Sequence, residues 1–141
     1  MFDKSKVLLT IDAMSFTMTR SSYLSWIVFQ MEGTVDSSNE QEALARIKEQ
    51  RQVCPARVAL QMSRCESMNI KTLREIAQWA DAARAAKGEL IILEPSVSIR
   101  NQLDTFVGRH RIRQVDSKAE LNLEETYGYT NGIRKPFEGA L

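Results

Sequence analysis

One stretch decides the fold of this sequence: residues 57–93, RVALQMSRCESMNIKTLREIAQWADAARAAKGELIIL. It opens with apolar side chains at every second position, Leu60 and Met62 among them, which is typical of a strand. After a polar segment, apolar residues recur every three or four positions, so they line one face of a long helix. Residues 89–93 are then continuously apolar, as in a strand buried inside a sheet. This order predicts two parallel strands joined by a right-handed helical crossover.

The same alternation of strands and helices continues on both sides of this stretch. Strands are predicted at residues 7–11, 16–19 (a separate strand or a continuation of the first), 24–31, 57–62, 89–93 and 111–115. Helices are predicted at about residues 38–50, 69–87 and 96–107, with a last turn or more at 117–121. The short connections favour an α/β fold, a four- or five-stranded, mostly parallel or mixed sheet with packed helices.

The length of 141 residues suits one domain with a core of its own. We expect this single domain at residues 1–123. Residues 124–141 contain tyrosines, glycines and a proline without any periodicity. This composition predicts a C-terminal extension or a partly disordered tail.

The composition is that of an ordinary globular protein, with 43% apolar and 26% charged residues and a formal net charge of +1. This charge does not support a strongly basic nucleic-acid binder, and the basic run at residues 109–113 lacks interleaved aromatic residues. That run instead predicts a solvated edge strand. No apolar run approaches the ~20 residues that cross a bilayer, and the charged N-terminus does not match a signal peptide. We therefore expect a cytoplasmic protein that binds no nucleic acid and inserts no segment into a membrane.

Residues that could carry chemistry are few and are not grouped along the chain. Cys54 and Cys65 fit no metal-binding spacing, and His110 is the single histidine, so we expect no metal and no cofactor. Reduced, partly buried thiols are favoured in a cytoplasmic protein, and a disulfide or redox pair is the alternative. His110 has no serine or cysteine partner at a catalytic spacing, and there is no glycine-rich phosphate loop. The sequence predicts no enzymatic activity.

Four short segments stand in an order that carries more information than any one of them. They are Gly33-Thr34-Val35-Asp36, residues 60–70, residues 87–93 and residues 94–100. The first segment is similar to Gly-x-hydrophobic-Asp, and residues 60–70 are similar to a strand and loop that ends in Asp-Ser-Ser/Thr-Gly-Leu. Residues 87–93 are similar to Gly-Gly-Glu-Leu, and residues 94–100 to Asn-Pro-Ser-Pro-x-Val-Arg. Together they resemble the STAS domain, the family named for sulfate transporters and anti-sigma-factor antagonists. The resemblance covers about residues 16–121.

The resemblance also indicates what this chain lacks. In the family's antagonists, the second hydroxyl of the Asp-Ser-Ser/Thr-Gly loop receives a phosphate from a partner kinase. Alignment of the loops places Glu66 on the Asp, Ser67 on the first Ser, Met68 on the phosphorylated position and Asn69 on the Gly. Methionine has no hydroxyl group, so the phospho-switch is missing at its usual place. Ser67 is then the remaining candidate phosphate acceptor.

Residues Glu66, Ser67, Met68 and Asn69 are therefore the candidate partner-binding site that the resemblance implies. The helix that starts near Asn69 directs free N–H groups and a positive dipole end at this segment, which suits a partner's carboxylate. Glu66 and Ser67 also suit the N-cap of that helix. Met68 suits either an exposed protein contact or core packing under the helix start.

The function implied by the resemblance is that of a bacterial regulatory module in signal transduction and transcription regulation. It would bind a protein, either an anti-sigma-factor-like kinase or another signalling complex, and it could form a homodimer. The alternative is a structural subunit of a larger assembly, such as a stressosome-like particle or the cytoplasmic part of a membrane transporter. Trp79, beside the apolar stripe of the long helix, is predicted to be a core or boundary residue, with partner anchoring as the alternative.

Overall fold

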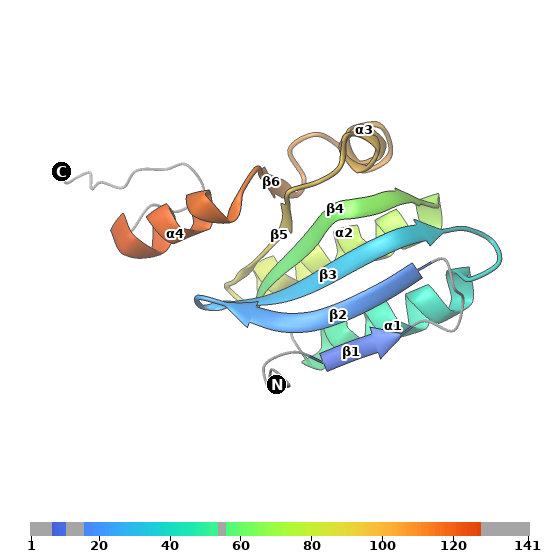
Figure 1. Ribbon diagram of the computed structural model, residues 1–141, viewed down its shortest axis with the longest axis horizontal. Coiled ribbons are helices and arrows are strands. Elements are labelled where there is room, and N and C mark those ends of the chain that lie inside the picture. The colour runs from blue at the N-terminus through green and yellow to red at the C-terminus, as the bar shows by residue number, and fades with distance from the viewer. Residues whose placement is uncertain (1–6, 11–15, 54–55, 128–141) are drawn as a thin grey trace.

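The computed structural model describes residues 7–10, 16–53 and 56–127 (Figure 1). Its strands are β1 (Val7–Thr10), β2 (Phe16–Tyr23), β3 (Trp26–Val35), β4 (Arg57–Met68), β5 (Glu89–Leu93) and β6 (Arg113–Val115). Its helices are α1 (Glu40–Val53), α2 (Ile70–Ala85), α3 (Val97–Phe106) and α4 (Lys118–Tyr127). Strands and helices thus alternate from β3 onward, as the sequence predicts.

The strands form one mixed sheet in the order β1-β2-β3-β4-β5-β6. Strands β1, β2 and β3 are antiparallel neighbours, and β3 to β6 pair in parallel. The predicted α/β class with a mixed sheet is confirmed. The described residues form six strands where four or five were expected, because β1 and β2 are two separate strands that pair side by side.

The strands lie in the sheet in the same order as in the chain, and this order determines on which face the crossover helices lie. Right-handed crossovers that step in one direction across a sheet all lie on the same face. Accordingly α1, α2 and α3 contribute to a single core with one face of the sheet, and Figure 1 shows α1 and α2 behind the strands. The largest fully buried side chains of this core are Trp79, Phe16, Phe29, Met18, Met31, Ile47, Leu60, Met62, Met68, Leu73 and Ile76.

The opposite face of the sheet carries a second, smaller core, to which helix α4 contributes. Its members are Trp26, Val28, Ala59, Ile91, Leu93, Val115 and Leu121. Two cations lie over aromatic rings at its border, Arg57 at 4.2 Å from the ring centre of Trp26 and Lys118 at 5.2 Å from that of Tyr23. The aliphatic stems and charged groups of these two side chains separate the apolar cluster from water.

The helices deviate from their predicted bounds by a few residues. Helix α1 covers 40–53 instead of 38–50, α2 covers 70–85 instead of 69–87, and α3 covers 97–106 instead of 96–107. The predicted last helical turn is a full helix, α4, which runs across the expected domain boundary at residue 123. Most of the expected extension, residues 128–141, lies outside the described residues.

Trp79 is a core residue, as the first of its two interpretations predicts. Its side chain is fully buried, and its ring centre lies 5.4 Å from that of Phe29 in a tilted arrangement. Cys65 is also buried, and this burial raises the pKa of its thiol to about 12, with the Glu66 carboxylate as a smaller cause. The Cys65 thiol is therefore protonated at neutral pH. Cys54 lies outside the described residues.

The basic run at residues 109–113 forms an edge strand only in part. Residues 109–111 make a turn, Ile112 is buried in the main core, and β6 begins at Arg113. No helix in the described ranges is long and apolar enough to cross a membrane. Among the described residues, no group of three or more His, Cys, Asp and Glu side chains could hold a metal ion.

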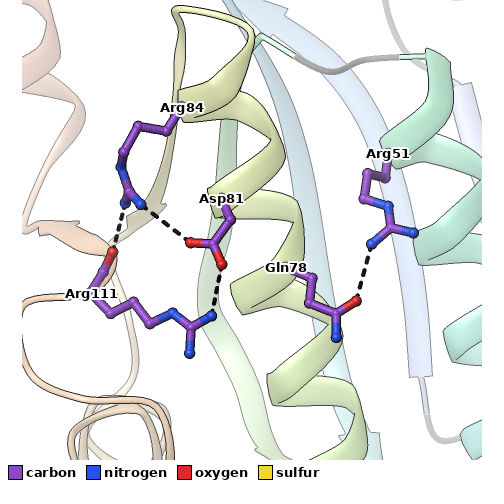
Figure 2. A network of polar contacts seen from close by, with 5 residues as sticks. All are labelled: Arg51, Gln78, Asp81, Arg84 and Arg111. Atoms are coloured by element: carbon purple, nitrogen blue, oxygen red, sulfur yellow. Dashed lines mark hydrogen bonds and ion pairs between the residues drawn. The ribbon is translucent and has the colours of Figure 1, made fainter.

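Polar side chains connect α2 with its neighbours on both sides (Figure 2). On one side, Arg51 of α1 lies 2.7 Å from the buried carboxylate of Glu75 and 3.5 Å from the side-chain oxygen of Gln78. The Arg51–Glu75 contact is close but lacks hydrogen-bond alignment, so charge attraction is its main component. On the other side, Asp81 and Arg84 contact the turn before β6.

Candidate functional site at the end of strand β4

Strand β4 extends far beyond its neighbour β5. Its pairing with β5 ends at Gln61 opposite Leu93, whereas its pairing with β3 continues to Met68 opposite Val35. The sequence predicts that this strand ends at Met62 and that a polar segment follows, and the predicted end is wrong. The reason is that the long strand β3 offers backbone partners along the whole segment, and pairing outweighs the low strand preference of its polar residues.

Two irregularities in the β3–β4 pairing shape the end of β4. The register shifts between Gln30 and Glu32 and again between Gly33 and Thr34. At the second shift Gly33 lies opposite Cys65 while Thr34 lies opposite Ser67, so Glu66 is the extra residue of a bulge. Gly33 has a φ of 102°, which L side chains rarely adopt. The bulge turns Glu66 to the surface, where its carboxylate accepts a hydrogen bond of 3.2 Å from the Thr34 hydroxyl.

Helix α3 lies beside the end of β4, past the point where β5 stops (Figure 1). The Ser96 hydroxyl donates to the carbonyl oxygen of Cys65 at 2.7 Å. The Gln102 side chain accepts from the backbone N–H of Met68 at 3.0 Å and donates to the carbonyl oxygen of the same residue at 2.9 Å. These bonds satisfy backbone groups that would otherwise lack a partner. They hold the end of β4 as a strand.

The structure separates the four candidate site residues into two kinds. Met68 is 1% exposed and belongs to the main core, so its interpretation as an exposed contact does not apply to this structure. Glu66 is exposed and Ser67 is half-buried, so both reach the surface. Within the described part of the chain, no hydrogen-bond partner is found for the Ser67 hydroxyl.

Asn69 is the N-cap of helix α2, a role that the sequence interpretation assigned to Glu66 or Ser67. Its side-chain oxygen accepts from the backbone N–H of Thr72 at 3.2 Å and from the Thr72 hydroxyl at 2.6 Å. Its side-chain nitrogen donates to Glu40 of α1 at 2.6 Å. Asn69 therefore joins the starts of two helices. Glu66 and Ser67 cannot cap α2 because they belong to β4.

Charged side chains surround this helix start. Lys71 lies 3.5 Å from Glu40, and its side chain is 75% exposed. Asp36 follows β3, and hydrogen bonds from the hydroxyl and backbone N–H of Ser38 lower the pKa of its carboxyl group below the usual value. Asp36 is therefore ionised at neutral pH. The surface at the end of β4 thus combines carboxylates with the positive dipole end of α2.

We expect Asn69→Ala to lower the free energy of unfolding by about 1–2 kcal/mol, because one side chain both caps α2 and contacts Glu40. Urea unfolding followed by circular dichroism measures this loss. Asn69→Ser keeps a capping oxygen, so it should lose less. An alanine variant as stable as the wild type would contradict the capping role.

Sequence reasoning did not identify the residues that brace this site. Thr34, Ser96 and Gln102 act through the backbone or side chain of a distant segment. Ser96 carries a local signal, since it is also the N-cap of α3 and its hydroxyl accepts from Ile99. Gln102 has no such local signal, because a glutamine beside the apolar stripe of a helix is usually interpreted as a surface residue.

A search of solved structures finds three that are similar to this chain. The anti-sigma factor antagonist SpoIIAA in its unphosphorylated form matches with a TM-score of 0.59 and 14% sequence identity, over 81% of this chain and 99% of that chain. The Bacillus cell fate determinant SpoIIAA in the phosphorylated form matches with a TM-score of 0.55 and 13% identity, over 74% and 96% of the two chains. An antisigma-factor antagonist STAS domain from Rhodobacter sphaeroides matches with a TM-score of 0.42 and 16% identity, over 61% and 97%.

The two SpoIIAA structures show that this chain has their fold, which is the fold expected from the STAS resemblance. No protein-family model matches the sequence. No curated protein sequence matches it significantly.

Proposed function

We propose that this chain is a non-catalytic regulatory module that binds another protein through the end of β4 and the start of α2. The fold that it shares with an anti-sigma factor antagonist supports this general kind of function. The partner in this proposal is an anti-sigma-factor-like kinase or a related signalling protein. The contact surface consists of Glu66, Ser67 and the first turn of α2, with Met68 as its buried support.

One observation carries the proposal: the end of β4 is a braced strand that presents polar groups without burying them. Glu66 is turned outward by the bulge, and Ser67 follows beside the N-terminus of α2. Because Ser96 and Gln102 fix the backbone, little conformational freedom remains to be lost when a partner binds. A preorganised surface of this kind suits protein recognition.

The proposal includes the loss of the usual phospho-switch. Met68, which aligns with the phosphorylated position, has no hydroxyl group and is buried. Ser67 is half-buried and remains the only hydroxyl among Glu66, Ser67, Met68 and Asn69. We propose that Ser67 stays unmodified in the working protein. Partner binding is then set by concentration, by competition or by a signal that acts on the partner.

We expect Ser67→Glu to weaken partner binding about 10- to 100-fold, because it places a poorly paired charge in an interface, at a cost of about 1–3 kcal/mol. The partner is first captured from the native cell and then titrated by calorimetry. Ser67→Ala should bind like the wild type. Ser22→Glu is the matched control, since Ser22 is exposed near the β2–β3 turn at the opposite end of the sheet.

Equal affinities of Ser67→Glu and the wild type would show that the end of β4 is not the contact surface. The switch is tested separately, by incubation of the chain with a candidate partner kinase and ATP followed by mass spectrometry. Stoichiometric phosphate on Ser67 would show that the chain has a phospho-switch. It would not contradict the proposed binding surface.

A further inference from the structure

We infer that a hollow between α3 and residues 109–114 is a binding site for a compact phosphorylated anion, apart from the proposed partner surface. The hollow has a volume of about 480 Å³ and opens to solvent. Its lining residues are Arg100, Asp104, Arg109, His110, Ile112, Arg113 and Gln114. The volume falls in the range of small-molecule sites.

The charge of the lining favours an anion. Among the described lining residues, three carry a guanidinium group and one, Asp104, carries a carboxylate. Asp104 compensates this charge only weakly, since its carboxylate lies 3.8 Å from Arg109, whose side chain is 73% exposed. Guanidinium groups offer paired N–H donors whose geometry matches phosphate oxygens.

Two of the arginines are held in place by carboxylates that do not belong to the lining. Glu89 accepts two hydrogen bonds of 3.0 Å from Arg113, and Asp116 accepts one of 3.0 Å from Arg100. Arg100 also donates to the side-chain oxygen of Gln114 at 3.2 Å. These contacts fix the two guanidinium groups before any ligand arrives, which lowers the entropic cost of binding. The same carboxylates offset part of the positive charge. Because Asp116 is 71% exposed, water screens much of its charge, whereas Glu89 is 27% exposed and offsets the charge of Arg113 more fully.

The turn of residues 109–111 is also held against helix α2 through Arg111 (Figure 2). Arg111 donates to Asp81 of α2 at 2.8 Å, and Arg84 donates both to Asp81 at 3.2 Å and to the carbonyl oxygen of Arg111 at 2.9 Å. On the other side of this anchor, Ile112 is buried in the main core. The wall of the hollow therefore has a defined shape.

The lining also restricts the chemical class of the ligand. Its described residues include no Trp, Tyr or Phe side chain on which a nucleobase could stack. Ile112 is the only apolar side chain among these described lining residues, so a large hydrophobic group would find little contact. A compact anion with one or two phosphoryl groups fits the remaining chemistry, whether it is a free phosphate compound or the headgroup of a larger molecule.

Pyrophosphate is a suitable probe, added to the full chain at constant ionic strength and followed by amide NMR. We expect saturable shifts at residues 109–114 and about tenfold weaker binding in Arg109→Gln, which removes one charged donor. Asp104→Asn should bind more tightly, because it removes the opposing charge. Arg46→Gln is the matched control, since Arg46 is an exposed arginine on α1 with a single ion pair, and its affinity should equal that of the wild type.

Three results would each contradict the proposed site. They are shifts that do not saturate, an equal loss of pyrophosphate affinity in Arg109→Gln and Arg46→Gln, and weaker pyrophosphate binding in Asp104→Asn. Chloride at the same ionic strength should cause no matching shifts, and matching shifts would show general screening instead of a site. A parallel titration with glycerol phosphate tests whether the site accepts the headgroup of a larger molecule. If pyrophosphate binds and glycerol phosphate does not, the ligand is a free phosphate compound.

Discussion

Met68→Asp is expected to lower the free energy of unfolding by about 3–5 kcal/mol, the range for a buried charge without a partner. The Met68 side chain is 1% exposed and lies in the main core with residues of all three crossover helices. A carboxylate there would either remain charged in an apolar site or bind a proton, and both outcomes cost free energy. Urea unfolding at pH 7 measures the loss.

Two variants make this test specific to the core position. Met68→Leu nearly keeps the side-chain volume, so we expect it to cost less than about 1.5 kcal/mol. Ser67→Asp places the same charge one residue earlier on a half-buried side chain, and we expect it to stay close to the wild type in stability. If Met68→Asp and Ser67→Asp had equal stability, Met68 would be a surface residue and the observed burial would be wrong.

Gly88→Ala is expected to cost about 2–3 kcal/mol, because no space exists for a methyl group at this position. A Cβ atom on Gly88 would lie in contact with the carbonyl oxygen of Ala56 and only 2.6 Å from its carbonyl carbon. The same oxygen accepts a hydrogen bond of 2.6 Å from the backbone N–H of Glu89. Relief of the clash would therefore disturb the start of the β4–β5 pairing. Thermal and urea unfolding both report the loss.

Gly108→Ala is the matched control for this variant. Gly108 has a φ of 116°, but the nearest atom to an added methyl group is 4.0 Å away. Its substitution should cost about 1 kcal/mol, from backbone strain alone. A loss at Gly88 no larger than that at Gly108 would mean that α2 and the start of β4 do not approach as closely as described.

The sequence predicts the helices and the sheet well because their signals are local. The apolar stripe of α2, the cap at Ser96 and the continuous apolar run of β5 each depend on neighbouring residues only. The prediction is poorest at the end of β4, where the pairing with β3 and the hydrogen bonds from α3 decide the conformation. Such contacts between distant segments leave no trace in a short window of sequence.

The burial of Met68 shows the difficulty at one residue. Leu60 and Met62 are buried, and strict alternation would next bury Arg64 and Glu66. Two register shifts change this order, so that Cys65 and Met68 are buried and Arg64 and Glu66 are exposed. Neither bulge follows from propensity, although Gly33 marks the place of the second. The sequence therefore predicts the segment of the candidate site but not which of its side chains reach the surface.

Helix α3 touches both of the surfaces proposed above. Its N-cap residue Ser96 and its Gln102 hold the backbone of β4, while its Arg100 and Asp104 line the hollow. A displacement of α3 would thus alter the two surfaces together. Should an anion in the hollow change the affinity for the protein partner by some factor, the partner must change the affinity for the anion by the same factor. Control by a bound anion would then act on a module whose Met68 cannot be phosphorylated.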